Sequence, residues 1–346
     1  MSRKNTVSFK PKQVVKKLLT VLNERARDVI VGRYGLGTST KKETLESIGG
    51  KYGITRERVR QIENHALATI RKSEDFGKEK ASFEEIRTLI HSLGCLVAEE
   101  DLLAHVSSDQ NVRNAIHFML VLGDAFIHEK EDEHFKKHWC IDADLSGKIK
   151  GSLKKIYESL SDDDLISDPD MVKSFLGYIE DVSDEFKSEE IVKRWLSVSK
   201  KIKKNPLGEW GKTESPNVSA KGIRDYAYLV LRRHGSPIHF REVAKAIEGV
   251  FGKKAHIATT HNELIKDKRF VLVGRGLYAL TEWGYARGVV KDVIRDVIEK
   301  SGPLSKKEVI EKVLKERYVK ENTILVNLQN PKYFKRQKDG TYTVIK

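Results

Sequence analysis

The chain of 346 residues lacks the features that mark secreted and membrane proteins. Its two cysteines, Cys95 and Cys140, form no close pair in sequence, so we expect a reducing compartment and no disulfide framework. No apolar run approaches the roughly 18 residues that a membrane-spanning helix needs. The basic N-terminus is not followed by the apolar segment of a signal peptide. We therefore expect a cytoplasmic protein that does not contact membranes.

Patterns of catalysis and cofactor binding are scarce as well. No Ser-His-Asp, paired-carboxylate or Walker-type pattern occurs in the sequence. The densest group of potential zinc ligands is His128, Glu131, His134, His138 and Cys140. A His-x3-His pair near a cysteine can bind zinc, but charged residues alternate here with aromatic ones, which is more typical of an exposed hairpin. We predict no enzymatic activity, no cofactor and no metal site.

Positively charged residues outnumber negatively charged ones and give a net charge of +14, which is unevenly distributed along the chain. Residues 1–72 hold 17 Lys and Arg against 6 Asp and Glu, and residues 200–346 hold 32 against 16. Residues 73–199 hold 15 against 28. A basic block attracts polyanions and an acidic one repels them, so we expect the two flanking blocks to suit nucleic acid. The acidic middle block either faces a basic protein surface or folds back on the chain's own basic ends.

Residues 44–72 have the pattern of two helices joined by a tight turn. Gly53 occupies a position that requires positive φ, and Thr55 follows as the N-cap of the second helix. The apolar residues of that helix recur every three or four positions and predict one buried face: Val59, Ile62, Ala66 and Ile70. The pattern predicts a helix-turn-helix.

The opposite face of the second helix presents residue types that read base edges in DNA. The outward residues are Arg56, Glu57, Arg58, Arg60, Gln61, Asn64 and Arg71. Arginine pairs with guanine, glutamine and asparagine pair with adenine, and glutamate accepts from cytosine. We predict all seven as DNA-binding residues, with Arg58 and Arg71 on flanking phosphates. The alternative is an ordinary amphipathic helix with a charged face in solvent.

The sequence TLESIGGKYGITRERVRQIENHALATIRK, at residues 44–72, resembles region four of the primary bacterial sigma factors, which reads the −35 promoter element. The preceding LNERARDVIVGRYGLG is similar to the helix before that motif. The resemblance implies that Arg56, Glu57 and Gln61 contact bases, and that Arg58 and Arg60 contact phosphates or flanking positions. Gly49-Gly50 departs from a regular first helix, either to allow close packing or at a cost in stability. We expect no strand-melting segment of a complete sigma factor.

A second pattern recurs through the rest of the chain, with intervals of six, six and two residues. Its three full copies are Leu196, Ile202, Gly208 and Trp210, then Leu264, Phe270, Gly276 and Tyr278, then Leu328, Phe334, Gly340 and Tyr342. Leu120 and Phe126 begin a partial copy, with Asp132 in the glycine place and His134 in the aromatic place. We predict that each copy joins a third helix to a two-stranded wing, the plan of a winged helix, and that its apolar members are buried.

The copy that begins at Leu264 has a resemblance of its own. In it we expect helices at 223–234, 240–250 and 258–266 and strands at 269–273 and 276–280. The sequence IRDYAYLVLRRHGSPIHFREVAKAI…HNELIKDKRFVLVGRGLYALTEWGY, at 223–285, resembles the HARE-type helix-turn-helix. That family includes the delta subunit of some bacterial RNA polymerases and chromatin- and restriction-associated proteins. The resemblance implies nucleic acid or polymerase-associated partners without defining base-reading residues.

These observations predict a mainly α fold with small β-hairpin wings, in which an N-terminal helix-turn-helix precedes tandem winged-helix domains. The expected domains are 1–77, 78–145, 146–212, 213–286 (HARE type) and 287–346. The predicted function is a sequence-specific DNA-binding transcription factor, with double-stranded DNA and RNA polymerase as partners. The alternatives are a polymerase-associated adaptor and an accessory DNA-binding subunit of a restriction or defence system.

Overall fold

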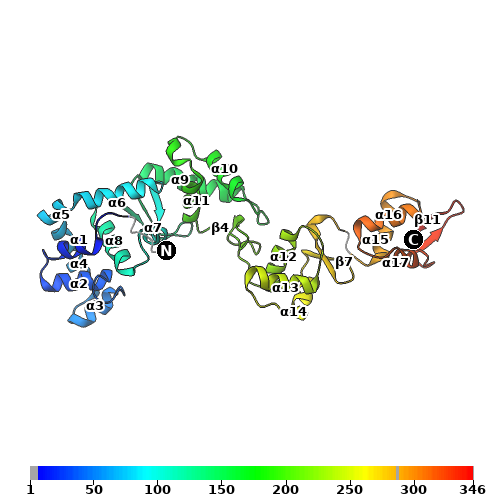
Figure 1. Ribbon diagram of the computed structural model, residues 1–346, viewed down its shortest axis with the longest axis horizontal. Coiled ribbons are helices and arrows are strands. Elements are labelled where there is room, and N and C mark those ends of the chain that lie inside the picture. The colour runs from blue at the N-terminus through cyan, green and yellow to red at the C-terminus, as the bar shows by residue number, and fades with distance from the viewer. Residues whose placement is uncertain (1–6, 286–287, 346) are drawn as a thin grey trace. The chain divides into compact units, whose positions relative to one another are not determined.

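The computed structural model describes residues 7–285 and 288–345, and the chain forms two compact units (Figure 1). The first unit holds the chain up to Lys203 together with Trp210–Thr213, and the second holds Lys204–Glu209 together with Glu214–Lys346. Helices dominate both units and the sheets are small, as the sequence predicts. In the described part of the chain, no helix combines the length and the apolar character that crossing a membrane requires.

Five helices begin the first unit. They are α1 (Pro11–Leu19), α2 (Glu24–Tyr34), α3 (Leu45–Tyr52), α4 (Arg56–Arg71) and α5 (Glu74–Lys78). Between α3 and α4, Gly53 has a φ of +60°, as the predicted turn requires. The hydroxyl oxygen of Thr55 accepts the backbone N–H of Arg58 and caps α4. The helix-turn-helix predicted from these residues is confirmed.

The two adjacent glycines of α3 differ in their surroundings. A Cβ added to Gly49 would lie 2.5 Å from the carbonyl oxygen of Ile54, whereas one added to Gly50 would meet no atom within 4 Å. Gly49 is therefore required for the close approach of the turn to α3. Gly50 lies in the same helix without a packing reason in the structure.

The remainder of the chain repeats one order of elements: helix, strand, two helices and two strands. The first repeat is α6 (Lys80–Ser92), β1 (Leu96–Ala98), α7 (Glu99–Val106), α8 (Gln110–Leu122), β2 (Ile127–Glu129) and β3 (His138–Cys140). The second is α9 (Ala143–Ser159), α10 (Asp168–Tyr178), η1 (Asp184–Phe186), α11 (Glu189–Val198), β4 (Ile202–Lys204) and β5 (Trp210–Lys212). In this second repeat the first strand is reduced to a single bridge between Ile166 and Trp210.

The second unit contains two further repeats. The third is α12 (Ile223–His234), β6 (Ile238–His239), α13 (Phe240–Phe251), α14 (Ile257–Lys266), β7 (Phe270–Gly274) and β8 (Leu277–Leu280), and the short η2 (Thr281–Trp283) follows it. The fourth is α15 (Val290–Ser301), β9 (Leu304–Ser305), α16 (Lys306–Glu316), α17 (Glu321–Leu328), β10 (Phe334–Arg336) and β11 (Thr341–Val344). The bounds of the third repeat lie within a few residues of those predicted from the sequence.

The three-stranded sheets share one strand order. The sheets run β1-β3-β2, β6-β8-β7 and β10-β11-β9, so the last strand of each repeat lies between the other two. An aromatic residue of that central strand lies opposite an apolar residue of the first strand in each case. The pairs are Val97 with Trp139, Ile238 with Tyr278 and Leu304 with Tyr342.

The recurring apolar positions are buried, which confirms their prediction as core residues. The buried set comprises Leu120, Phe126, Leu196, Ile202, Trp210, Leu264, Phe270, Tyr278, Leu328, Phe334 and Tyr342. The prediction of His134 in the aromatic place is wrong, because Trp139 occupies the central strand of the first repeat. The connection between β2 and β3, residues 130–137, is longer than the other hairpins, and this shifts the register beyond the fixed interval. For the same reason His138 is buried rather than exposed in a hairpin.

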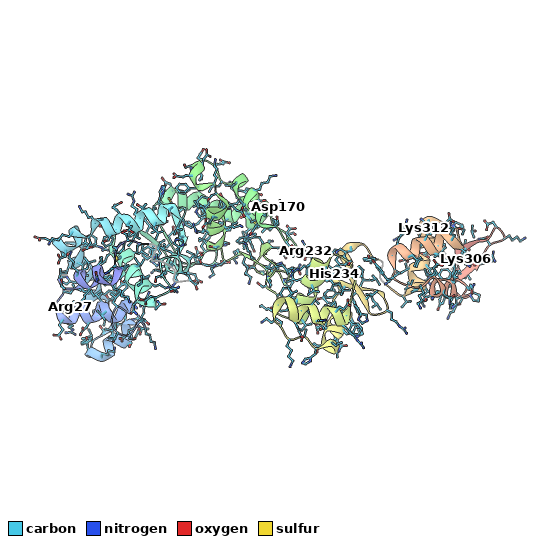
Figure 2. The ribbon with its side chains drawn as sticks, in the orientation of Figure 1. Arg27, Asp170, Arg232, His234, Lys306 and Lys312 are labelled. Atoms are coloured by element: carbon cyan, nitrogen blue, oxygen red, sulfur yellow. The ribbon has the colours of Figure 1, made fainter. Side chains whose placement is uncertain are left out.

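A single hydrophobic core extends across residue 77. It joins Leu18 of α1, Ile30 of α2 and Ile70 of α4 to residues of α6–α8, among them Ile90 and Phe118. Arg27 of α2, labelled in Figure 2, donates to the carbonyl oxygen of Leu19 at the end of α1. The helix-turn-helix and the first repeat are thus packed on each other. A separate small core, formed by Val29, Ile48 and Val59, lies between α2, α3 and α4.

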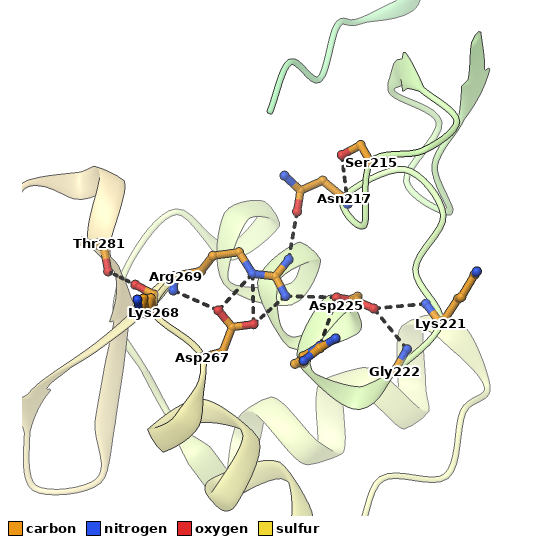
Figure 3. A network of polar contacts seen from close by, with 10 residues as sticks. Ser215, Asn217, Lys221, Gly222, Asp225, Asp267, Lys268, Arg269 and Thr281 are labelled. Atoms are coloured by element: carbon orange, nitrogen blue, oxygen red, sulfur yellow. Dashed lines mark hydrogen bonds and ion pairs between the residues drawn. The ribbon is translucent and has the colours of Figure 1, made fainter. Parts of the chain in front are cut away.

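A polar network organises the third repeat (Figure 3). The guanidinium of Arg269 donates to Asn217 at 2.9 Å, to Asp225 at 2.9 Å and to Asp267 at 2.6 Å. Asp225 also accepts the backbone N–H of Gly222 at the start of α12. Burial raises the pKa of Asp267, but the hydrogen bonds from Arg269 outweigh it and the pKa lies below its ordinary value. The side chain of Arg269 therefore joins three segments: Asn217 before α12, Asp225 in the first turn of α12, and Asp267 at the end of α14.

Candidate nucleic-acid interface

The predicted DNA-binding residues of α4 lie on its exposed side, away from the large shared core and the small core that its inner face contacts. Val59 and Ile70 are fully buried on the inner face, whereas Arg56, Gln61 and Asn64 are exposed. The side chain of Arg56 retains 74% of its accessible surface. The amphipathic pattern of the sequence therefore places the polar types of residues 56–64 toward solvent, as a surface that reads DNA requires.

Four of these side chains are paired with each other. Arg60 donates to both carboxylate oxygens of Glu57, at 3.0 and 2.8 Å, and Arg58 donates to the side-chain oxygen of Gln61 at 3.0 Å. The hydrogen bond from Arg60 holds the pKa of Glu57 below its ordinary value. Exposed pairs of this kind contribute little to stability, about 0–1 kcal/mol. Exchanging them for contacts to bases or phosphates therefore costs the protein little.

Arg56 has its partner on the other helix of the motif. Its guanidinium lies 3.3 Å from the carboxylate of Glu46 on α3, and both side chains are well exposed. This pair is also weak, so little stability is lost if Arg56 exchanges Glu46 for another acceptor.

A groove of about 740 Å³ runs beside this face. It is lined by Asn23, Glu24, Arg25 and Ala26 at the start of α2, and by Arg58, Gln61, Ile62 and His65 of α4. Asn23 caps α2 by accepting the backbone N–H of Ala26 at 2.9 Å. The amino end of α2 thus borders the face on the side of Arg58 and Gln61, the two residues that are hydrogen-bonded to each other.

Arg71, the last of the seven predicted residues, contacts the first repeat. It donates to the carbonyl oxygens of Leu122 at 3.0 Å and Val121 at 2.8 Å, and its guanidinium lies 3.6 Å from Asp124. These acceptors end α8, where a cation is favoured by the unpaired carbonyl groups and the helix dipole. The structure therefore gives Arg71 a role in joining α4 to α8, and does not bring it together with the other six residues.

Sequence reasoning missed a residue that fixes the motif from the first repeat. Asn114 of α8 is buried, and its side-chain amide donates to the carbonyl oxygens of Gly35 and Thr40, each at 2.9 Å. Gly35 has a φ of +63°, and an added Cβ would lie 2.5 Å from the carbonyl oxygen of Thr40. The loop between α2 and α3 is thereby held against α8. No local pattern signals a contact between residues 79 positions apart.

Two of the histidines considered as zinc ligands lie beside carboxylates, His128 at 3.4 Å from Glu99 and His138 at 3.6 Å from Glu129. Glu99 is buried and accepts from Trp139 at 3.0 Å, and Lys137 lies 2.9 Å from it. Burial raises the pKa of Glu99, but hydrogen bonds from His117 and Lys137 bring it well below its ordinary value. The ring of His128 stacks on Trp139 at 4.4 Å. Among the described residues no group of three or more potential ligands is arranged to hold a metal ion.

Comparison with known proteins identifies one part of the chain. Residues 18–72 match the family "Sigma-70, region 4". RNA polymerase sigma factor RpoD of Helicobacter pylori (strain ATCC 700392 / 26695) is 43% identical over 67 residues, which are 19% of this chain and 10% of that protein. The principal sigma factor HrdD of Streptomyces coelicolor is 41% identical over 66 residues, 19% of this chain and 20% of that protein.

A third relative, sigma factor SigA of Nostoc sp. (strain PCC 7120 / SAG 25.82 / UTEX 2576), is 49% identical over 57 residues, 16% of this chain and 14% of that protein. The chain thus spans about a tenth to a fifth of the length of the curated relatives it matches. Its N-terminal module is like sigma region four, a DNA-binding helix-turn-helix of transcription proteins.

Proposed function

We propose that this protein is a sequence-specific transcription regulator whose module at 18–72 reads a promoter-like DNA element. The observation that carries the proposal is the exposed face of α4 within the matched residues 18–72. The resemblance to region four implies that Arg56, Glu57 and Gln61 of this face contact bases. Their exposure and their weak pairing with neighbouring side chains support base reading, since each has hydrogen-bonding groups that a base edge can engage. Reading the element, rather than melting it, is the proposed role.

The other residues of the face serve affinity and register in this proposal. Arg58 borders the groove beside α2, and we assign it, with Arg60, to phosphates next to the bases that are read. Asn64 lies one helical turn beyond Arg60 and is assigned to a base edge. Arg71 is left out, because its guanidinium is engaged at the end of α8.

We further propose that residues 223–285 form a HARE-type winged helix, and that the four repeats are tandem winged helices. The shared strand order and the buried aromatic residue of each central strand support this assignment. The proposed domain limits remain 1–77, 78–145, 146–212, 213–286 and 287–346, with the first two packed through one core. RNA polymerase is the proposed protein partner, because region four belongs to sigma factors and the HARE-type resemblance includes a polymerase subunit.

The experiment is selection of sites from random duplex DNA by the full-length protein, followed by affinity measurements with two variants. Arg56→Ala and Gln61→Ala are each expected to weaken binding to the selected site by about 1–3 kcal/mol and to relax its sequence preference. Arg87→Ala, an exposed arginine of α6, is the matched control and should keep both. Equal losses on selected and random DNA would assign Arg56 and Gln61 to phosphates and reject base reading.

A polymerase-associated adaptor is the second candidate. The region-four module packs on the acidic first repeat through a shared core. This packing favours an adaptor, because a module that only reads DNA does not need a second protein surface beside it. In that case the module contacts polymerase rather than a promoter element. Binding of the full-length protein to core RNA polymerase without DNA, together with failure to select any DNA sequence, would establish the adaptor over the regulator.

A further inference from the structure

Tyr333, between α17 and β10, is surrounded by three positively charged side chains. The Lys291 ammonium lies 4.6 Å from the centre of its ring and donates to its hydroxyl oxygen at 3.4 Å. The Arg295 guanidinium lies 5.9 Å from the ring centre and the Lys332 ammonium 5.8 Å. A tyrosine ring attracts cations through its negative face, so Tyr333 holds the three charges close together.

These charges lack acidic partners in the part of the chain that the structure describes. Neither Lys291, Arg295 nor Lys332 has a carboxylate within ion-pair distance there, and the nearby carboxylate of Asp292 accepts the backbone N–H of Val289 at the start of α15. Lys291 and Arg295 are also one turn apart on α15, an arrangement of like charges that disfavours a helix. Such a cluster is stabilised when an anion binds beside it.

The adjacent hairpin extends the cluster. Its basic residues are Lys335 and Arg336 on β10 and Lys338 in the turn, and all three are exposed. Residues 332–338 contain no acidic residue. Together with Lys291, Arg295 and Lys332, the hairpin presents six cations from two neighbouring elements, since β11 of the same hairpin packs on α15. We refer to these six residues and Tyr333 as the Tyr333 cluster.

We propose that the Tyr333 cluster is a second DNA contact, which binds phosphates of a duplex without reading its sequence. The proposal rests on the proposed function in one respect, since it assumes that the chain's polyanionic ligand is DNA. The lysine and arginine side chains of this hairpin and of α15 supply positive charges that attract the phosphates of a DNA backbone. The Tyr333 ring keeps three of the cations, Lys291, Arg295 and Lys332, close together before DNA arrives. The predicted reading residues are all in α4, so this contact adds affinity but no sequence preference.

The test uses the full-length protein and duplex DNA of random sequence, with affinity measured across a series of salt concentrations. Each phosphate contact contributes a slope of about −0.9 to the dependence of log affinity on log salt. The variant K335Q/R336Q/K338Q is expected to make the slope shallower by about 2–3. The variant K291Q/R295Q, which changes α15 alone, should shift it in the same direction and provides an independent measure of the same contact.

The matched control removes the same charge elsewhere in the same repeat. It is K306Q/K312Q/K315Q on α16, where Lys306 and Lys312 are labelled in Figure 2. Its slope is expected to change by less than about 1, because the loss of net charge alone acts at long range and is screened. An equal change in control and hairpin variants, or no change in the hairpin variant, would overturn the proposal.

Further outcomes distinguish the Tyr333 cluster as a DNA contact from base reading by α4 and from membrane binding. If the hairpin variant flattens the salt dependence while the intact protein shows no sequence preference, the second contact stands and the proposed function fails. If α4 variants abolish a sequence preference and the hairpin variant binds random DNA like the intact protein, the reverse holds. Loss of binding to phosphatidylserine vesicles in the hairpin variant, with unchanged DNA binding, would assign the cluster to a membrane surface and reject it as a DNA contact.

Discussion

The side-chain amide of Asn114 donates to the carbonyl oxygen of Gly35 at 2.9 Å, across 79 positions of the chain. The same amide donates to Thr40, so the loop that leads into the helix-turn-helix is fastened to α8 of the first repeat. Arg71 of α4 makes a second connection, to the carboxyl end of α8. Polar contacts at the two ends of the motif therefore hold it in one orientation on the first repeat.

Removing the first of these contacts should loosen the motif. We predict that Asn114→Ala lowers the free energy of unfolding of the first unit by about 1–3 kcal/mol, because two carbonyl groups lose a buried donor. Urea unfolding of the full-length protein provides the measurement. Asn111→Ala, on the same helix but only half-buried, should cost less than about 0.5 kcal/mol. Equal effects of the two substitutions would show that the Asn114 contacts contribute nothing specific.

Arg71 should behave as a structural residue. Arg71→Ala is predicted to lower the stability of the first unit by about 1–2 kcal/mol through loss of two hydrogen bonds from a charged group. The ratio of affinities for selected and random DNA should stay that of the intact protein. A loss of affinity for the selected site with unchanged unfolding would restore Arg71 to the DNA-binding surface.

The sequence predicts well those structural features that depend on residues close together in the chain. The turn at Gly53, the cap at Thr55 and the outward face of residues 56–64 all follow from local backbone and helix periodicity, and the structure contains them. The repeated pattern ending in Tyr278 and Tyr342 was also sufficient to locate the buried residues of the later repeats. In these cases the interval between residues is short and fixed by one turn or one hairpin.

What the sequence could not predict depends on contacts between distant segments. The shared core across residue 77 arises because α1 and α2 lie against α8, and no local pattern in 1–77 signals this. Arg71 is a residue type that often contacts phosphates, but its guanidinium donates to carbonyl groups at the end of α8. Trp139 was missed because an elongated connection moved it out of a fixed interval. In each case tertiary packing determined the outcome.

The network around Arg269 predicts a dependence of stability on pH. Asp267 has a folded-state pKa below its ordinary value, which is about 3.9 in an unfolded chain. Its ionised form therefore adds stability above about pH 4, and this stability is lost as the pH falls through the folded-state pKa. We predict that Asp267→Asn destabilises the second unit by about 1–3 kcal/mol at pH 7. The difference from the intact protein should shrink between pH 4 and pH 2.

Thermal unfolding at a series of pH values measures this difference, and Asp225 provides a check. Asp225 keeps its contact to Arg269 in the variant, so the guanidinium remains paired at pH 7. A destabilisation by Asp267→Asn that is the same at pH 7 and at pH 2.5 would mean that the lost interaction does not depend on the charge of Asp267. The low pKa would then have another origin than Arg269.

The last prediction concerns the apolar positions of the repeats. Phe270 begins β7 and Phe334 begins β10, and both are buried against the third helix and the central strand of their repeats. Truncation of either to alanine should cost about 3–5 kcal/mol, through lost burial and the cavity left behind. For a small domain this is a large share of the total stability, so the affected repeat should open. Hydrogen exchange of the full-length protein resolves the repeats separately.

The expected pattern is specific to each repeat. Phe270→Ala should raise exchange across α12–β8, and Phe334→Ala across α15–β11, while the helix-turn-helix stays protected because its cores lie in the first unit. Leu272→Ala is the matched control, since Leu272 lies on the same strand as Phe270 but is 48% exposed. Similar exchange in Phe270→Ala and Leu272→Ala would mean that the recurring phenylalanine does not hold the third helix to the hairpin, and would remove the main physical reason for interpreting the four repeats as one architecture.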